Sequence, residues 1–283
     1  MPRLPYRPEG FGRYLGRTLN APSVLEFSWE ELCRAAITVG RRSWADVLKF
    51  GTYSLLEALW RVAIVRANLV EASDGRLQRS NAFSALDPSE KAGVSYFLGL
   101  ALTKLIAEKL FRVPWLLHLD TYRRQLAPEL AFPERPDFVG MDAWQLWIVA
   151  ESKGRSGTMP SALLDTAKRQ VRSLRRISGQ LPALRVAVAT YFSSDCLRAR
   201  LRDPATPDAT AIDIELSPEQ LARTYYRPVV EMIQTPGSLQ SRREVGGRVE
   251  VTTPLGDLDA TLALEERILS WYLEGRPNWS TFL

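Results

Sequence analysis

Three residues in the middle of the chain have the types and spacing of a cation-binding site. Asp137 lies upstream of an apolar run that ends in Glu151, Ser152 and Lys153. If the segment between them forms a hairpin whose turn centres on Trp144, Asp137 lies directly across from Glu151, with both side chains on one face about 5 Å apart. Two carboxylates this close repel each other unless a cation lies between them.

The neighbouring residues extend this chemistry. Lys153 returns to the face of Glu151 because side chains alternate along a strand. Carboxylate oxygens suit Mg²⁺ or Mn²⁺, and an ammonium group beside them can position a water molecule or offset the charge of a phosphate. The backbone carbonyl of Ser152 could complete the metal ligands, because its side chain points to the opposite face. The sequence therefore predicts a magnesium or manganese site at Asp137, Glu151 and Ser152.

A surface hairpin with alternating charges is the competing interpretation of this segment. Residues 146–150 (LWIVA) argue against it, because an uninterrupted apolar run is typical of a strand that is buried on both faces. A glutamate and a lysine at the end of such a strand must lie at a rim or in a cleft.

The pattern Pro136-Asp137 followed by Glu151-x-Lys153 on a hydrophobic strand resembles the PD-(D/E)XK nuclease superfamily. The resemblance implies a restriction-endonuclease-like core of a helix, three strands, a second helix and a further strand. The chain offers candidates in that order over about the middle third to half of its length. They are a helix at 88–111, strands at 115–124, 137–142 and 145–153, a helix at 161–177 and a strand at 184–192.

The same resemblance implies metal-dependent hydrolysis of phosphodiester bonds, in DNA more than in RNA. Asp137 and Glu151 would hold the metal, and Lys153 would orient or deprotonate the attacking water. Superfamily members often take another carboxylate from the helix before the first strand, which makes Glu108 and Glu57 rival candidates. Pairing of Glu108 with Arg112, or of Glu57 with Arg61, would explain either glutamate without a metal.

Several residues after the third strand could support the site or bind phosphate. Gln170 resembles a glutamine that exonuclease-like branches of the superfamily carry on this helix. Lys168, Arg172 and Arg175 recur at helical spacing and predict a basic stripe that contacts phosphates, although a solvated face has the same pattern. Arg155 could hold a phosphate bidentately.

Other polar residues give weaker indications of function. His118 and Asp120 share a face of the first predicted strand, where a lone histidine is usually a hydrogen-bonded structural residue. Cys33 and Cys196 are too far apart in the sequence to suggest zinc ligands or a disulfide framework. No glycine-rich phosphate loop or nucleophile-elbow motif is present in the sequence.

Composition favours a globular protein with a polyanionic partner. The 283 residues carry a formal net charge of +5 and a sequence pI near 9.3, which is compatible with nucleic-acid binding. The sequence has no run of eighteen apolar residues and no apolar N-terminal signal, so we expect a soluble cytoplasmic protein without a membrane partner.

The periodic segments predict an α/β fold with a central mixed sheet flanked by helices. Residues 1–87 form a helical N-terminal extension in this interpretation, residues 88–235 the nuclease-like core, and residues 236–283 a small β-α appendix. Within the extension, we expect an irregular arm at the start, helices from Ser28 and over 43–70, and a linker over 72–87. The residues at Asp87 and Ser217 are typical of helix starts, the second for a helix through about 233. In the appendix we expect a short strand over 248–253 and a short helix over 262–273.

Three hypotheses about function follow. The first is a Mg²⁺- or Mn²⁺-dependent nuclease, which at the family level could be directed by a partner such as a helicase or act as the effector of a bacterial antiviral defence system. The second is a catalytically silent nucleic-acid-binding or scaffold protein that keeps the nuclease-like fold. The third is an interaction adaptor built on the helical N-terminal part.

Overall fold

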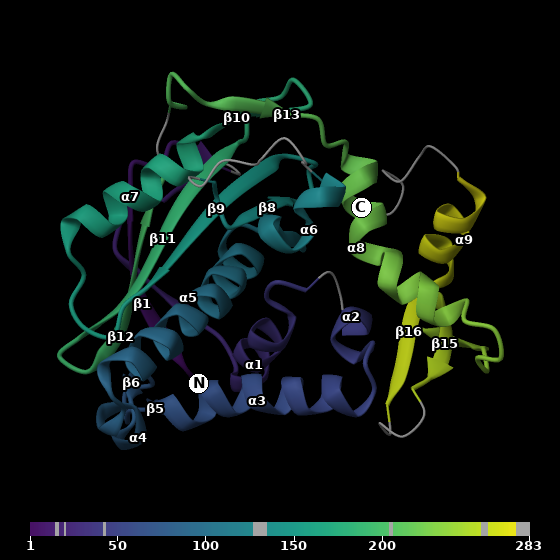
Figure 1. The fold of residues 1–283 in the computed structure, drawn as a ribbon, viewed down its shortest axis with the longest axis horizontal. Coiled ribbons are helices and arrows are strands. Elements are labelled where there is room, and N and C mark those ends of the chain that lie inside the picture. The colour runs from purple at the N-terminus through teal and green to yellow at the C-terminus, as the bar shows by residue number, and fades with distance from the viewer. Residues whose placement is uncertain are drawn as a thin grey trace.

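A central mixed β-sheet runs through the molecule and carries the predicted site (Figure 1). The computed structural model describes residues 1–14, 17–19, 21–41, 44–126, 135–203, 206–255 and 260–275. The strand order is β4-β1-β12-β11-β9-β8-β7, and β5 and β6 join the sheet at β12. These strands are β1 (Arg3–Glu9), β4 (Ser23–Glu26), β5 (Leu69–Glu71), β6 (Leu77–Arg79), β7 (Trp115–His118), β8 (Phe138–Met141), β9 (Trp147–Gly154), β11 (Leu184–Ser193) and β12 (Cys196–Arg202).

Helices cover both faces of this sheet, as predicted. On one face, α1 (Trp29–Thr38) and α5 (Pro88–Leu110) enclose the largest apolar core, which includes Ile148 and Val186 of the central strands. On the other face, α7 (Ser161–Arg172) packs on β9 and β11, while α8 (Pro218–Ile233) lies near the β7 edge with Val139 and Val149 in its core. The alternation of side chains along each strand separates the two cores.

Further elements surround the sheet. They are α2 (Trp44–Leu48), α3 (Thr52–Asn68), α4 (Asn81–Ala85), α6 (Leu119–Leu126), α9 (Glu266–Glu274), the pair β2 (Arg13–Tyr14) and β3 (Arg17–Thr18), the pair β10 (Leu174–Ile177) and β13 (Ile212–Ile214), and a small sheet of β14 (Ser241–Val245), β15 (Arg248–Pro254) and β16 (Thr261–Glu265). No helix in the described ranges has the length and apolar character needed to cross a membrane.

The predicted hairpin around Trp144 is confirmed. Strands β8 and β9 pair antiparallel, with Phe138 opposite Ala150 and Met141 opposite Trp147. The turn is held by Asp142, whose Oδ1 accepts hydrogen bonds from the backbone N–H groups of Trp144 at 2.9 Å and Leu146 at 2.8 Å. This register continues to the positions just beyond β8, where Asp137 comes to face Glu151.

Two predicted elements end earlier than the sequence indicated. The strand expected over 115–124 stops at His118, and α6 begins at Leu119. The helix expected over 161–177 ends at Arg172, because Leu174 and Ile177 are buried in strand β10, which pairs with β13. Arg185 of β11 fixes this change of direction by donating to the backbone carbonyl of Leu174 at 3.1 Å.

The N-terminal segment contributes strands as well as helices, which corrects the expectation of an irregular arm. β1 pairs parallel with β12 and antiparallel with β4 inside the central sheet. The predicted linker over 72–87 contains β6 and α4, and both Leu77 and Phe83 in it are fully buried. The helix expected over 43–70 is broken near Gly51 into α2 and α3, because Gly51 has a positive φ of 57°.

The C-terminal segment also differs in part. The strand expected near Arg248 is confirmed as β15, but residues 261–265 form β16 where a helix was expected to begin, so that α9 starts only at Glu266.

Helix α5 approaches β9 unusually closely, and two glycines make this possible. A Cβ atom on Gly154 would lie 1.7 Å from the backbone oxygen of Ser95, and one on Gly99 would lie 3.0 Å from the backbone of Gly154. The helix is long and well capped, since Asp87 and Glu90 form a capping box at its start. The contact fixes the end of β9, and therefore Glu151 and Lys153, against a rigid support.

We predict that Gly154→Ala lowers the free energy of unfolding by about 3 kcal/mol, because backbone atoms of α5 would have to move to accept the methyl group. Urea denaturation of both proteins measures the change. Gly157→Ala is the matched control, since a Cβ there meets nothing within 4 Å. Equal stabilities of the two variants would contradict the proposed close contact.

Candidate functional site

The carboxylates of Asp137 and Glu151 each accept a hydrogen bond from the backbone of the opposite strand at the open end of the β8–β9 hairpin. The N–H of Asp137 donates to Glu151 Oε2 at 2.8 Å, and the N–H of Ser152 donates to Asp137 Oδ2 at 2.9 Å. These two hydrogen bonds hold both carboxylates beside each other, although strand β8 begins only at Phe138. The predicted juxtaposition of the two acids is therefore present in the structure.

The pair lies in a buried, electrostatically unfavourable position. The Glu151 residue is only 1% exposed, and its pKa is raised to about 8, first by burial and then by the charge of Asp137. Burial also raises the pKa of Asp137, against the lowering effects of the Ser152 N–H, His118 and Lys153. A buried carboxylate with so high a pKa binds a proton at neutral pH unless a cation takes the place of that proton.

Lys153 supplies one positive charge to this pair. Its Nζ lies 2.6 Å from Glu151 Oε1, while the side chain keeps 23% of its surface exposed. Ser152 points to the opposite face, as predicted, where its Oγ lies 3.2 Å from the position of a Cβ on Gly99. Because the N–H and C=O of a strand residue point to the same side, the carbonyl of Ser152 is directed to the side of Asp137.

Additional ionisable groups lie close enough to affect the acids electrostatically. Burial lowers the pKa of His118, whereas Asp137 and Asp120 oppose this effect. Burial and then Asp137 and Glu151 raise the pKa of Tyr96, which projects from α5 and is half exposed. The prediction that His118 and Asp120 share a face of one strand is wrong, because β7 ends at His118 and Asp120 lies on α6 in an ion pair with Arg135.

Gln170 reaches the same region from helix α7. Its Nε2 donates to the backbone oxygen of Arg135 at 3.3 Å, two residues before Asp137. Its Oε1 is buried and has no hydrogen-bond partner in the described parts of the chain. A buried amide oxygen without a donor is costly, so it provides an acceptor that a bound water or cation could use.

The structure does not bring the two rival glutamates to the acid pair. Glu108 binds Arg34 at 2.9 Å and Lys104 at 3.1 Å, rather than the expected Arg112. It lies nine residues beyond Gly99 on α5, which is about 13 Å along the helix from the contact with β9. Glu108 is therefore already paired with Arg34 and Lys104 and lies away from the acid pair.

Glu57 belongs to a separate ion-pair group on α3. Burial would raise its pKa, but the guanidinium groups of Arg41 and Arg61 lower it below the usual value. The pairing with Arg61, at 2.9 Å, is the alternative that the sequence left open. Neither glutamate is therefore available in this arrangement to complete a site at Asp137.

The predicted phosphate-binding residues are split between two positions. Arg155 follows β9 directly, is exposed, and has no side-chain partner within the described residues. Lys168 and Arg172 lie on the same flank of α7 as Asp165, which pairs with Arg202 of β12. Gln170 lies on a different flank of the helix and contacts Arg135, so the two basic residues face away from it.

Arg172 and Arg175 are already engaged. Arg172 pairs with Asp208 at 2.9 Å, and Arg175 lies on β10 in an ion pair with Asp213 at 2.8 Å. The continuous helical stripe expected from the sequence is therefore wrong at Arg175, because the helix has ended before it.

Sequence reasoning missed Tyr96 and the glycine contact that holds α5 against β9. Gly99 in the middle of a helix and Gly154 directly after Lys153 were signals of a close backbone approach, since glycine weakens both helices and strands. Tyr96 lies one helical turn before Gly99, so the same contact brings it close enough to the two acids for their charges to raise its pKa.

The donor set fits a hard divalent cation in composition. Within the described residues, no group of three or more His, Cys, Asp or Glu side chains is arranged to hold a metal ion, so protein carboxylates would supply two ligands here. Glu151, Asp137, the Ser152 carbonyl and the orphaned Gln170 oxygen are all hard oxygen donors. Mg²⁺ commonly binds one or two carboxylates and keeps several waters.

Comparison of the chain with known proteins gives no further assignment. No family model matches it, and no similar protein is found among curated proteins or solved structures.

We predict that the buried acid makes stability depend on pH. Between about pH 5 and pH 8, folded Glu151 keeps a proton that the unfolded chain has lost, so the free energy of unfolding falls as pH rises. In Glu151→Gln this contribution is removed. Its stability relative to wild type should therefore increase by about 1 kcal/mol per pH unit across that range.

Urea denaturation at pH 5, 6, 7 and 8 in EDTA measures this difference. Glu231→Gln is the control, because Glu231 is half exposed on α8 in a surface pair with Arg227, away from the acid pair. A pH-independent difference for Glu151→Gln would show that Glu151 titrates normally.

Proposed function

We propose that this protein is a Mg²⁺- or Mn²⁺-dependent nuclease with a restriction-endonuclease-like core. The observation that carries the proposal is the buried Asp137–Glu151 pair, which has one lysine beside it and a deficit of positive charge. A structural ion pair would match each carboxylate with a cation, as Glu57 and Glu108 are matched. Asp137 and Glu151 have one lysine for two carboxylates, and a divalent ion would stabilise the second negative charge.

The chain's own residues divide the work as follows. Asp137, Glu151 and the carbonyl of Ser152 bind the cation, and Gln170 Oε1 accepts a hydrogen bond from water next to it. When bound, the cation supplies charge stabilisation for the phosphate that is attacked. Lys153 orients the attacking water by hydrogen bonding through its ammonium group, and Glu151 beside it keeps this ammonium in place.

Phosphate is the anion that best explains the neighbouring cations. Arg155 directly follows β9, two residues after Lys153, and its side chain is exposed and unpaired within the described residues. An arginine there can hold a phosphate oxygen next to the reacting group. DNA is the preferred substrate on the strength of the PD-(D/E)XK resemblance.

We expect purified protein with Mn²⁺ or Mg²⁺ to cleave labelled DNA and to lose activity in EDTA. Lys153→Ala should lower the cleavage rate by about 100-fold or more, because it removes the group that orients the attacking water. Asp137→Asn and Glu151→Gln should cleave more slowly than both the wild-type protein and Lys153→Ala, because each removes a negative charge from the metal ligands. Gel assays of linear, circular, single- and double-stranded DNA and RNA measure these rates.

Lys109→Ala is the matched control, because Lys109 lies at the end of α5 in a surface pair with Glu31. Wild-type rates for Asp137→Asn and Lys153→Ala would refute the nuclease proposal. Tight, salt-sensitive nucleic-acid binding with no cleavage under any metal would instead favour the silent binding protein.

A further inference from the structure

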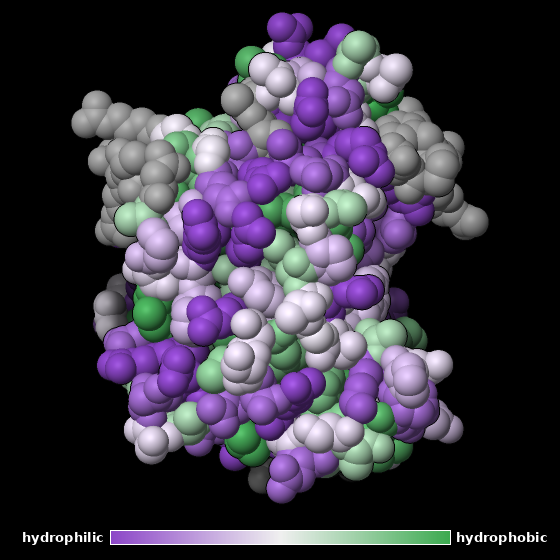
Figure 2. Space-filling view, turned by 90° about the vertical axis from the view of Figure 1, so that its left-hand side faces the viewer, coloured by the Kyte–Doolittle hydropathy of each residue, from purple (hydrophilic) through white to green (hydrophobic). Residues whose placement is uncertain are grey.

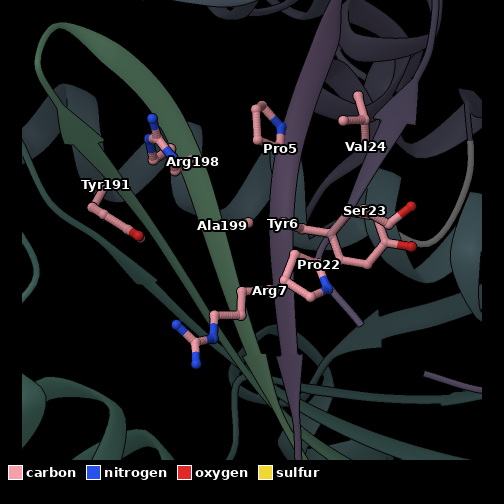
Figure 3. Close-up of a pocket in the computed structure, with 9 residues that line it drawn as sticks. All are labelled: Pro5, Tyr6, Arg7, Pro22, Ser23, Val24, Tyr191, Arg198 and Ala199. Atoms are coloured by element: carbon pink, nitrogen blue, oxygen red, sulfur yellow. The ribbon is translucent and has the colours of Figure 1, made fainter. Parts of the chain in front are cut away.

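A groove lies on the sheet two to three strands away from the acid pair. It has a volume of about 470 Å³, in the range of small-ligand sites. Figure 3 shows Tyr191 and Arg198 on the same side of the view, with Arg7 below them and its guanidinium pointing away from Arg198. The groove is lined by Pro5, Tyr6, Arg7, Pro22, Ser23, Val24, Tyr191, Arg198 and Ala199.

The register of the sheet connects this groove to the candidate site. Lys153 pairs with Ala189, Ala189 with Arg200, and Arg200 with Arg7, so these residues form one row across β9, β11, β12 and β1. Three strand spacings amount to about 14 Å. The next row along β11 and β12 pairs Tyr191 with Arg198, at the end where Arg155 leaves β9.

All of these side chains project from one face of the sheet. Leu197, Ala199 and Leu201 of β12 and Leu4 of β1 belong to the core under α5, so their neighbours point to the face that carries α7. Helix α7 covers this face over β9 and β11, where Ala187 and Ala189 admit it closely. Beyond α7 the arginine side chains remain accessible.

The charge on this part of the face is positive. Glu9 is shared by Arg200 and Arg202, and Arg7 lies 3.8 Å from it. Arg198 has no partner within the described residues, and its Nε is buried. Hydrophilic residues cover much of the side of the molecule shown in Figure 2. An unpaired, partly buried guanidinium requires an anion or another acceptor to offset its desolvation.

We infer that this groove binds a single-stranded segment of nucleic acid, with phosphates on Arg7 and Arg198 and a base stacked on Tyr191. Positive charge combined with an aromatic ring is the pattern by which proteins hold unpaired strands. A strand leaving the groove past Arg155 would reach Lys153 within about 14 Å. The identification of that strand as substrate depends on the proposed nuclease function, whereas its binding does not.

Binding is measured by fluorescence anisotropy with labelled dT12 in EDTA, so that no cleavage occurs. Arg198→Gln should weaken the affinity of dT12 about tenfold and reduce the slope of log K against log salt concentration by about 0.7. Tyr191→Ser should also weaken binding, while Tyr191→Phe should restore it, because only stacking is required. Arg227→Gln, at a surface pair on α8, is the control and should bind as wild type does.

Thermal unfolding checks that each variant is folded, and Arg7→Gln provides a second test in the same groove. Wild-type affinity for dT12 in folded Arg198→Gln and Arg7→Gln would overturn the inference. So would binding of dTMP as tight as that of dT12, or loss of affinity in Tyr191→Phe equal to that in Tyr191→Ser. A protein that binds dT12 through the groove but cleaves no nucleic acid would support this inference while refuting the nuclease proposal.

Discussion

Burial of two adjacent carboxylates with a single ammonium group is the constraint on which the rest of this structure depends. Asp137 and Glu151 each accept a backbone N–H from the other's strand, so neither can move away to relieve the repulsion. The result is a pKa of about 8 for Glu151. Such an arrangement costs stability in the folded protein, and proteins keep costs of this kind chiefly at functional sites.

The surrounding fold serves to hold this unfavourable pair in place. The β8–β9 hairpin sets the register, and Asp142 fixes its turn, at the far end from the acids, with two backbone hydrogen bonds. On one side, α5 meets β9 at a contact that only glycine permits. On the other side, α7 places Gln170 next to the backbone just before Asp137. The β8–β9 hairpin, α5 and α7 therefore each hold one part of the site in position.

The parts of the site that could be predicted from the sequence are those determined by local periodicity. The apolar run before Glu151 and the turn at Trp144 were sufficient to place Asp137 opposite Glu151, because strand register is set by a short hairpin. The helix starts at Ser28, Asp87 and Ser217 followed from their capping residues, and all three form capping boxes.

Long-range pairing explains what the sequence could not indicate. The parallel partner of β1 lies almost 200 residues away in β12, so nothing local marks the first residues as a central strand. Likewise, Leu174 and Ile177 match a helical period, but pairing with β13 and the reach of Arg185 make them a strand. Glu57 and Glu108 looked alike in sequence, and only their arginine partners in space separate them from the acid pair.

Calorimetric titration of the wild-type protein with Mn²⁺ at pH 7, repeated in two buffers of different ionisation enthalpy, tests the central claim most directly. If the cation displaces the proton that Glu151 holds, close to one proton is released for each Mn²⁺ bound, and Glu151→Gln releases none. Binding of Mn²⁺ without proton release, or equal binding by Glu151→Gln, would contradict the proposed metal site.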